Sequence, residues 1–514
     1  MNKAAGRQRT KTEPADVLIE GARVCDGTGQ PAFPANVAIR NGRIAAVSVS
    51  ACPPARQRLR ANGLTVAPGF IDVHTHGDRI VEFPAAENLV RQGITTIVSG
   101  NCGSSCLPVA PFLDKVAAAE PALNYATLVG HGSLRRQVMG MAARAPSREE
   151  LRAMCRLAAR AMREGALGMS SGLFYVPGAW AGTDELVEIS RAIAEAGGVY
   201  ASHKRSAGGK VFEAVEEAVE IGRRASISVQ ISHLKTLHRR GRTRPDRMRE
   251  LLALIRRCRE EGVDVAFDIH PYPATFTSLA AVTIPEWVRE GGRQAERLRD
   301  AAVRRRIRRE VAGKIAWIGG ADKIRVLAFE PDRKLRGLTL DVIAQRRKTN
   351  AVETAMDLVA DGETLCTFHA LRQTDTDRAL TDELAMIASD GGVVSPKQAF
   401  AHPRNFGTFP LVLARYVREL GLLRLEDAVR KMTWTPARKF GLTGRGLVAE
   451  GMAADLVVFD SARIGSQADF ARPRQAPSGI RWVFVNGRLA WGPRRSDRGR
   501  WGQVLRGRDA SRRM

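Results

Sequence analysis

Through the middle of the chain, short apolar runs alternate with longer segments in which apolar and charged residues recur at helical spacing. The nine apolar runs are 65–73, 95–102, 125–132, 166–175, 199–203, 227–233, 263–270, 365–369 and 385–390. Apolar strands separated by amphipathic helices are typical of a parallel sheet covered by helices on both faces. The pattern therefore predicts an α/β fold with a (β/α)8 TIM barrel over residues 67–440. A barrel needs eight strands, so one run is accessory, and we expect it to be 365–369.

Both ends of the chain have a different sequence pattern, with short predicted strands in which apolar and polar residues alternate. An Asn-Gly step joins two such strands at Asn41-Gly42, and another does so at Asn486-Gly487. Asn-Gly between alternating apolar positions is a strong signal for a tight β-hairpin turn. We predict one small β-sandwich domain built from residues 15–66 and 441–495.

Residues 285–350 interrupt the alternation of strands and helices in the middle of the chain. They are charged and arginine-rich, with helical spacing and a β-like patch at 314–318. We predict an inserted subdomain over the mouth of the barrel, which could be a lid or a surface insertion. Residues 1–14 are predicted to be a disordered basic tail, and residues 496–514 a basic C-terminal tail.

The composition narrows the class of protein. The 514 residues carry a net charge of +26, which permits nucleic-acid binding. The arginines are spread over several predicted helices, however, and no nucleic-acid-binding motif is present. We therefore expect a solvated basic surface and no nucleic-acid partner. Seven scattered cysteines do not form a disulfide framework. No apolar run reaches the roughly 18 residues of a membrane span, and the N-terminus is polar and basic, which predicts a cytoplasmic protein.

Residues that can ligate a metal follow the predicted strands. His74 and His76 are two apart at the end of the first run, so a strand directs both imidazoles to one face. Cys102, His203 and His233 end later runs. A barrel gathers the C-terminal ends of its strands on one rim, and zinc accepts imidazole and thiolate ligands. The sequence thus predicts a zinc site.

Asp390 adds a carboxylate at the same predicted rim. Zinc lowers the pKa of bound water toward roughly 7, and a nearby aspartate can accept its proton and pass it to a leaving amine. The set predicts metal-assisted hydrolysis with Asp390 as general base and acid.

At these motifs the chain resembles the amidohydrolase superfamily, and specifically the D-aminoacylase (N-acyl-D-amino-acid deacylase) family. The resemblance covers nearly the whole chain. Asn101-Cys102-Gly103 is its most diagnostic part, because many amidohydrolases use a carboxylated lysine or a glutamate where this family uses cysteine. The motifs are Pro68-Gly-Phe-Ile-Asp-Val-His-Thr-His, Gln92-Gly-Ile-Thr-Thr-Ile-Val-Ser-Gly-Asn-Cys-Gly, Gly172-Leu-Phe-Tyr-Val-Pro-Gly, Gln230-Ile-Ser-His-Leu-Lys, Ser389-Asp-Gly and His402-Pro-Arg-Asn-Phe-Gly-Thr-Phe-Pro.

The resemblance implies roles for individual residues. It implies a tight zinc site at Cys102, His203 and His233, and a weaker second site at His74 and His76 that Cys102 can bridge. It implies that the substrate is a small N-acyl D-amino acid, split to a carboxylate and a free D-amino acid. The positions that match substrate-holding residues are Tyr175, Lys235, Tyr272 and Arg404.

The chain departs from the family pattern near the expected substrate. Lys204-Arg205 follows His203 where Met-Arg is usual, and the usual Tyr-Pro-Tyr reads His270-Pro-Tyr272. The loop after Asp390 is also longer than expected. Extra positive charge at Lys204 and Lys397 could favour an acidic side chain, or could mark a different amide.

Three alternatives stay open from the sequence. One is a cyclic-amide hydrolase of the dihydroorotase or hydantoinase type, which the missing lysine bridge disfavours. The others are a catalytically silent barrel and a nucleic-acid-binding protein, the second resting only on charge. The acyl group, the D-side chain, the metal stoichiometry and the oligomeric state do not follow from the sequence.

Overall fold

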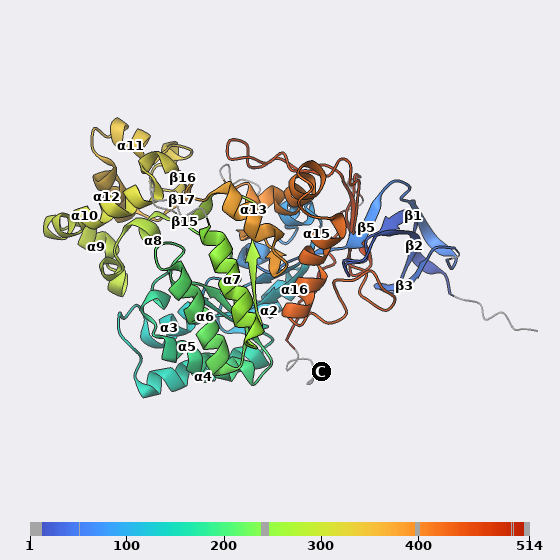
Figure 1. The fold of residues 1–514 in the computed structure, drawn as a ribbon, viewed down its shortest axis with the longest axis horizontal. Coiled ribbons are helices and arrows are strands. Elements are labelled where there is room, and N and C mark those ends of the chain that lie inside the picture. The colour runs from blue at the N-terminus through green and yellow to red at the C-terminus, as the bar shows by residue number, and fades with distance from the viewer. Residues whose placement is uncertain are drawn as a thin grey trace, which may run out of the picture.

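The structure is a computed structural model that describes residues 13–50, 52–237, 246–395, 401–494, 496 and 498–507. Most of the predicted N-terminal tail and Lys397 lie outside these residues. The described chain is a mixed α/β fold with one parallel strand system in the middle, a sheet at one end and a helix-rich segment at the other (Figure 1).

Short parallel strands form the middle of the fold. One three-stranded sheet contains β6 (Phe70–Asp72), β8 (Ile94–Ser99) and β9 (Asn124–Thr127). A six-stranded sheet follows in the order β10 (Val129–Gly130), β11 (Gly168–Gly172), β12 (Val199–His203), β13 (Ser228–Ile231), β14 (Val265–Ile269) and β18 (Ala385–Ile387). Leu128 alone separates β9 from β10, so the two sheets are continuous along the chain.

The first and last of these strands are linked by a further parallel pair. After β6 the chain forms β7 (Thr75–His76), and after β18 it forms β19 (Gly391–Gly392). These two short strands pair, with Gly391 opposite Thr75. The carboxyl ends of the first and last parallel strands therefore lie side by side.

Amphipathic helices connect the parallel strands. Their apolar faces join the strands in the largest buried cluster of the described chain. α4 begins at a capping box, in which Ser147 and Glu150 satisfy each other's backbone N–H groups. The helices between these strands are α2 (Val109–Ala118), α3 (His131–Met139), α4 (Arg148–Arg163), α5 (Thr183–Ala194), α6 (Val211–Ala225), α7 (Arg247–Glu260) and α13 (Gln373–Thr381). After the last parallel strands, α14 (Arg404–Leu411), α15 (Leu425–Met432) and α16 (Trp434–Lys439) lead to the terminal sheet.

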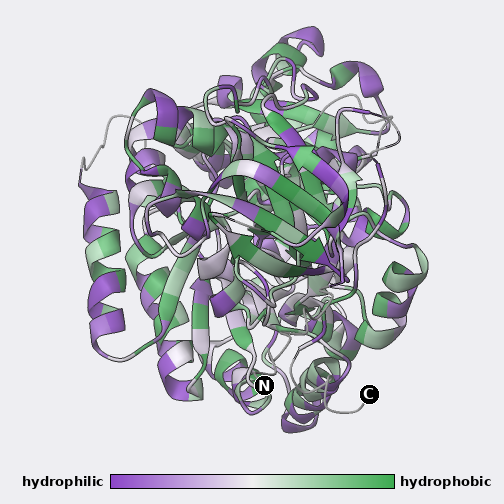
Figure 2. Ribbon diagram, turned by 90° about the vertical axis from the view of Figure 1, so that its right-hand side faces the viewer, coloured by the Kyte–Doolittle hydropathy of each residue, from purple (hydrophilic) through white to green (hydrophobic). Residues whose placement is uncertain are grey.

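Both ends of the chain contribute to one eight-stranded sheet, as the alternating pattern predicted. Figure 2 looks onto this end of the molecule, where strand residues are largely hydrophobic. Its N-terminal strands are β1 (Ala15–Val24), β2 (Phe33–Arg40), β3 (Arg43–Ser48), β4 (Ala55–Arg60) and β5 (Thr65–Pro68). Its C-terminal strands are β20 (Leu456–Phe459), β21 (Ile480–Val485) and β22 (Arg488–Trp491).

The two Asn-Gly hairpins are confirmed. Asn41 and Gly42 have φ of 51° and 76°, and Asn486 and Gly487 have φ of 50° and 77°, as a type I′ turn requires. These turns belong to strands at opposite ends of the sheet order, yet a Cβ on Gly42 would lie 3.1 Å from the Asn486 carbonyl oxygen. The hairpin turns at the two ends of the sheet order therefore lie in contact.

The apolar run at 65–73 is two strands, not the single strand that its pattern suggests. β5 pairs with β20 in the terminal sheet, whereas β6 pairs with β8 in the parallel system. The chain crosses between the sheets at Gly69, where a Cβ would lie 2.2 Å from the Thr95 side chain. Only glycine fits so close an approach.

A helix-rich segment with its own apolar cluster projects from the parallel system (Figure 1). The run at 365–369 is confirmed as accessory, because β17 pairs only within an antiparallel sheet of this segment. The prediction of a β-like patch at 314–318 is wrong, because these residues form the end of helix α10, which spans Ala301–Ile318. The cluster extends from Leu279 to Phe368, wider than the predicted 285–350. The elements are β15 (Thr275–Ser278), α8 (Leu279–Thr283), α9 (Gln294–Arg299), α10 (Ala301–Ile318), β16 (Ile324–Phe329), α11 (Leu340–Arg346), α12 (Ala351–Asp361) and β17 (Thr364–Phe368).

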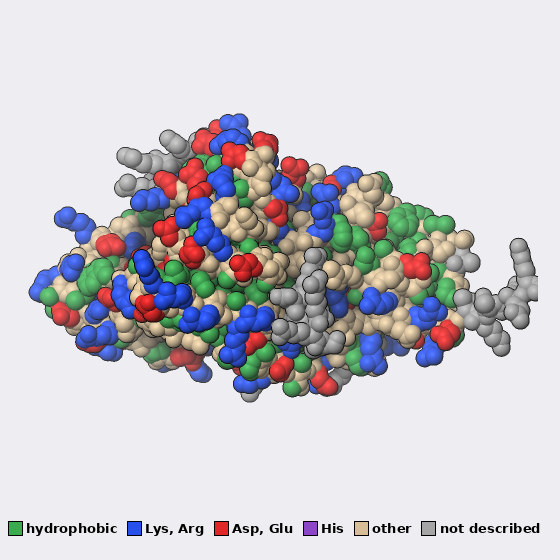
Figure 3. Space-filling view, turned by 90° about the horizontal axis from the view of Figure 1, so that it is seen from below, with side chains coloured by type: hydrophobic (Ala, Val, Ile, Leu, Met, Phe, Trp, Pro, Cys, Tyr) green, Lys and Arg blue, Asp and Glu red, His purple; other side chains and the backbone are tan. Residues whose placement is uncertain are grey.

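Basic residues are distributed over the surface. The face in Figure 3 shows lysines and arginines interspersed with acidic side chains, without a continuous basic stripe. The C-terminal segment is in part docked, because Leu505 donates a backbone hydrogen bond to Tyr125 and Gly507 one to Gly165. In the part of the chain that the structure describes, no helix has the length and apolarity to cross a bilayer.

Candidate metal centre

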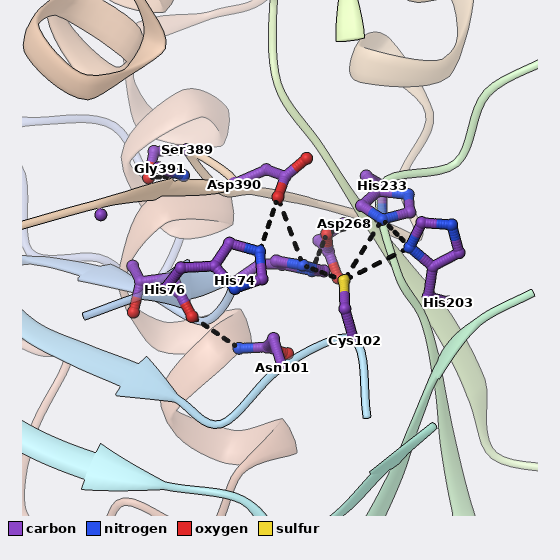
Figure 4. A network of polar contacts seen from close by, with 12 residues as sticks. His74, His76, Asn101, Cys102, His203, His233, Asp268, Ser389, Asp390 and Gly391 are labelled. Carbon is purple, nitrogen blue, oxygen red and sulfur yellow. Dashed lines mark hydrogen bonds and ion pairs between the residues drawn. The ribbon is translucent and has the colours of Figure 1, made fainter. Parts of the chain in front are cut away.

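The two histidines of the first motif lie at the carboxyl end of β6 and in β7. His74 is fully buried, and its Nδ1 lies 3.0 Å from Asp268 Oδ1. The Asn101 side chain donates to the carbonyls of Val73 and Thr75 and so holds this segment against the end of β8. The packing leaves His74 Nε2 directed toward Cys102 (Figure 4).

Cys102 lies at the centre of a group of imidazoles. Its Sγ is 3.3 Å from His74 Nε2, 3.3 Å from His203 Nδ1 and 3.7 Å from His233 Nε2. The latter two nitrogens are 2.9 Å apart. These residues come from the ends of β6, β8, β12 and β13, so the structure gathers four strand ends at one point (Figure 4).

The protonation states of Cys102, His203 and His233 suit metal binding. Burial alone raises the pKa of the thiol, but His74 and His203 outweigh it and hold that pKa well below its ordinary value. Burial lowers the pKa of His203 and, more strongly, that of His233. Thiolate and neutral imidazole are the forms that ligate a metal. Burial also lowers the pKa of His74, but Asp268 and Cys102 outweigh it and hold that pKa well above its ordinary value.

Backbone geometry at the site is unusual. Cys102, His233 and Asp390 have φ of 54°, 33° and 51°, a region that residues other than glycine seldom occupy. Gly103 follows Cys102 because a Cβ there would lie 2.6 Å from the backbone nitrogen of Gly172. The glycine of the Asn-Cys-Gly motif thus lets the Cys102 loop pack against the end of β11.

Asp390 faces the same centre from the end of β18. Its Oδ1 is 3.3 Å from His76 Nε2 and 3.6 Å from His74 Nε2, and its Oδ2 accepts a 2.8 Å hydrogen bond from Arg404. Burial alone raises the pKa of this carboxyl, but Arg404 and His76 hold it well below its usual range. Asp390 is therefore an anion that reaches both histidines of the first motif.

Two cavities meet at the centre, and both are lined by Cys102, Tyr175 and Asp390. We call the first, of about 240 Å³, the lysine cavity. Its lining includes Lys204, Lys235, Phe174, Leu237, Trp317 and Phe368. We call the second, of about 560 Å³, the arginine cavity, because Arg79, Arg136 and Arg404 line it.

The structure brings together all five predicted metal ligands and Asp390. Of the predicted substrate residues, Tyr175 and Lys235 line the lysine cavity, and Arg404 lines the arginine cavity while pairing with Asp390. Tyr272 is buried with its hydroxyl 3.4 Å from the Pro403 carbonyl, and it is not among the described residues that line either cavity. A substrate contact of Tyr272 stays a prediction.

Sequence reasoning did not find Asp268. This carboxylate contacts His74 Nδ1 through Oδ1 and also accepts the backbone N–H of His233 and the side chain of Gln230. It therefore orients two of the imidazoles, as carboxylates behind metal-ligating histidines do. The available signal was a carboxylate within the apolar run 263–270, where a buried charge needs a partner.

A family model for the amidohydrolase family matches residues 60–490. The chain belongs to the amidohydrolase family. Within this family, N-acyl-D-glutamate deacylase of Alcaligenes xylosoxydans xylosoxydans is 38% identical over 97% of this chain and 98% of its own length. D-Aminoacylase of the same organism is 35% identical over 94% of this chain and 96% of its own.

A crystal structure of another family member has the same fold as this chain. It is N-acyl-D-glutamate deacylase of Bordetella bronchiseptica, complexed with zinc and a phosphonate inhibitor that mimics the tetrahedral intermediate. It is 36% identical, with a TM-score of 0.83, and the match covers 96% of this chain and 100% of that chain. The family resemblance inferred from the sequence is thereby confirmed.

Proposed function

We propose that this amidohydrolase is a zinc-dependent deacylase that splits N-acyl-D-amino acids into a carboxylate and a free D-amino acid. The observation that carries the proposal is the group of thiolate and imidazoles around Cys102 with Asp390 beside it. The similarity to deacylases over nearly the full chain supports the choice of substrate class.

The donor atoms fit zinc. Ligands bound to one tetrahedral zinc at about 2.0–2.3 Å lie roughly 3.3–3.6 Å apart. The Cys102 sulfur lies 3.3–3.7 Å from three imidazole nitrogens, whereas His203 Nδ1 and His233 Nε2 are 2.9 Å apart and would separate slightly around a bound ion. We assign the tight site to Cys102, His203 and His233, and a weaker site to His74 and His76 with Cys102 shared. His74 could contribute to either site, because its ring nitrogens lie close to the ligand atoms of Cys102 and His233 and also to those of His76 and Asp390.

Zinc held by these residues would act as a Lewis acid that lowers the pKa of water toward about 7 and polarises a carbonyl. Asp390 accepts the proton of the attacking water and later donates it to the leaving nitrogen. Its low pKa keeps it ionised and able to accept, and its contact with His76 fixes its Oδ1 toward the centre. This assignment makes Asp390 the catalytic base and acid.

Tyr175, Lys235 and Arg404 are proposed to hold the substrate. Tyr175 lines both cavities, and Lys235 places a cation in the lysine cavity for the substrate carboxylate. The planar guanidinium of Arg404 can bind a substrate carboxylate through two hydrogen bonds while it keeps its hydrogen bond to Asp390.

We expect Arg404→Lys to raise KM far more than it lowers kcat. Lysine keeps the positive charge beside Asp390 but loses the bidentate grip, which costs on the order of 2 kcal/mol of mostly uniform binding. Steady-state kinetics on the purified variant measures both constants. An unchanged KM with a reduced kcat would mean that Arg404 acts only through Asp390.

We also propose that the parallel strands, with β9 and β10 counted as one, close into a (β/α)8 barrel over residues 67–440. The pairing of β7 with β19 supports closure. The touching Asn-Gly turns support a β-sandwich domain over 15–66 and 441–495. The predicted insertion at 285–350 lies within the segment whose own apolar cluster runs from Leu279 to Phe368. We keep a cytoplasmic location as part of the proposal.

The rival functions have less support. A cyclic-amide hydrolase would use a bridging lysine or glutamate where this chain has Cys102. The contact of Asp390 with the centre disfavours a catalytically silent barrel. Nucleic-acid binding rests on net charge alone, and on the face in Figure 3 the basic side chains are interspersed with acidic ones.

The proposed function is tested by a substrate screen. Zinc-loaded protein is incubated with N-acetyl-D- and N-acetyl-L-amino acids, and ninhydrin reports free amine. We expect release only from D-substrates. Hydrolysis of hydantoins or dihydroorotate with no release from the linear amides would replace this proposal with the cyclic-amide one.

A further inference from the structure

Lys204 is a buried cation at the centre that the proposed mechanism does not use. It follows His203 directly, its side chain is among the most buried in the protein, and its residue exposure is 2%. Its Nζ has no hydrogen-bond partner among the described residues. A buried ammonium without a partner is costly, so it needs a compensating anion.

Asp268 and the Cys102 thiolate favour the charged form of Lys204, but neither accepts a hydrogen bond from its Nζ, and Asp268 is already engaged by His74. Asp390 is the sole carboxylate among the described residues that line the lysine cavity, and it already pairs with Arg404. The neighbouring Arg205 is satisfied by Glu217 and by two backbone carbonyls. Lys204 and Lys235 therefore both line the lysine cavity, and its one carboxylate among the described residues is already paired with Arg404.

The two lysines differ in access to the cavity. Lys235 is partly exposed, whereas Lys204 is buried, and burial together with repulsion by Lys235 lowers the pKa of Lys204 to about 7. An anion bound beside Lys204 would favour its charged form. Phe174, Leu237 and Trp317 give the same cavity apolar walls. A ligand that suits this arrangement has two anionic groups joined by a short apolar stem. One carboxylate meets Lys235, the stem packs against the apolar walls, and the second carboxylate meets Lys204.

We propose that Lys204 selects substrates in which the D-amino acid has an acidic side chain, by pairing with that side-chain carboxylate. The inference rests on the proposed function and names its substrate class. A neutral side chain leaves the buried ammonium unpaired, and sites built around a buried polar group reject ligands that lack its partner.

The test compares acid and amide pairs of nearly equal shape. N-Acetyl-D-glutamate is measured against N-acetyl-D-glutamine, and N-acetyl-D-aspartate against N-acetyl-D-asparagine. We expect kcat/KM to favour the acid by roughly 100-fold in the parent. In Lys204→Met the preference should fall to within about threefold, with N-acetyl-D-methionine hydrolysed at least as well as before.

Two controls keep the result interpretable. Lys210→Met changes an exposed lysine of the same segment and should leave the acid preference intact. Lys204→Met should retain zinc and melt no lower than the parent, because methionine removes an unpaired buried charge at similar volume.

Three outcomes would overturn the assignment. One is an equal loss on all four substrates in Lys204→Met, as a purely structural lysine would give. Another is a Lys204-dependent gain for a carboxylate on the acyl group, tested with N-succinyl- against N-butyryl-D-methionine. The third is a parent with no acid preference that still deacylates D-substrates. If the parent hydrolyses no N-acyl-D-amino acid, the proposed function itself is wrong. The substrate screen on the parent protein shows that result separately.

Discussion

Asp390→Asn is expected to reduce kcat by about 10²–10⁴-fold while zinc stays bound, since that is the usual contribution of a positioned general acid–base group. Asparagine keeps the shape of the side chain but cannot accept the proton of the attacking water. The metal ligands Cys102, His203 and His233 are untouched by the change. The measurement is kcat and bound zinc on the same preparation, against the parent and an Asp184→Asn control at an exposed surface ion pair.

The structure also defines the competing role for Asp390. Its Oδ1 lies in reach of His74 and His76, so it could serve as a metal ligand or hold its loop through Arg404. In either case zinc content or melting temperature should fall together with activity. Activity within about tenfold of the parent at full zinc would remove Asp390 from the mechanism and leave the leaving amine without a proton donor.

Cys102→Ala is expected to weaken zinc binding by more than about 100-fold, and activity at limiting zinc should fall with it. Loss of an outer-shell partner alone typically costs about 10–100-fold in metal affinity, and Cys102 contributes the only thiolate at the point where three imidazoles meet. Metal analysis after dialysis against a weak chelator gives the stoichiometry. The parent should retain about one zinc per chain and fill a second site only at higher metal.

Cys106→Ala is the matched control for this variant. Cys106 lies four residues along the same loop, is partly exposed and is not among the described residues that line either cavity. Its loss should leave zinc unchanged. A second readout is the rise of melting temperature on adding zinc, which should disappear only in Cys102→Ala. Full zinc retention by Cys102→Ala would assign the tight site to other residues.

The parts of the fold that were predictable depended on local pattern. The Asn-Gly hairpins follow from two residues and their alternating flanks, and the turn conformation agrees. The gathering of His74, Cys102, His203 and His233 followed from one rule, that parallel strands bring their carboxyl ends together. Each of these inferences needs only a strand and the residue that ends it.

The parts that were missed depended on partners far along the chain. The run 65–73 divides because its first half pairs with β20, which no local pattern indicates. The patch at 314–318 was assigned to a strand because a short apolar run does not separate helix from strand. Asp268 was overlooked because its role depends on His74, which lies about 190 residues earlier in the chain. Tyr272 matched a motif, but its side chain turns toward Pro403.

The pairing of β5 with β20 has a consequence for how the protein is made. Val66 pairs with Val458, so about 390 residues must be translated after β5 before its partner exists. At roughly 5–20 residues per second, the ribosome needs about 20–80 seconds for that stretch. During that time β5 waits with one edge unpaired, and an unpaired edge is a template for wrong pairing between nascent chains. The terminal sheet therefore cannot be completed until the C-terminal strands have been made.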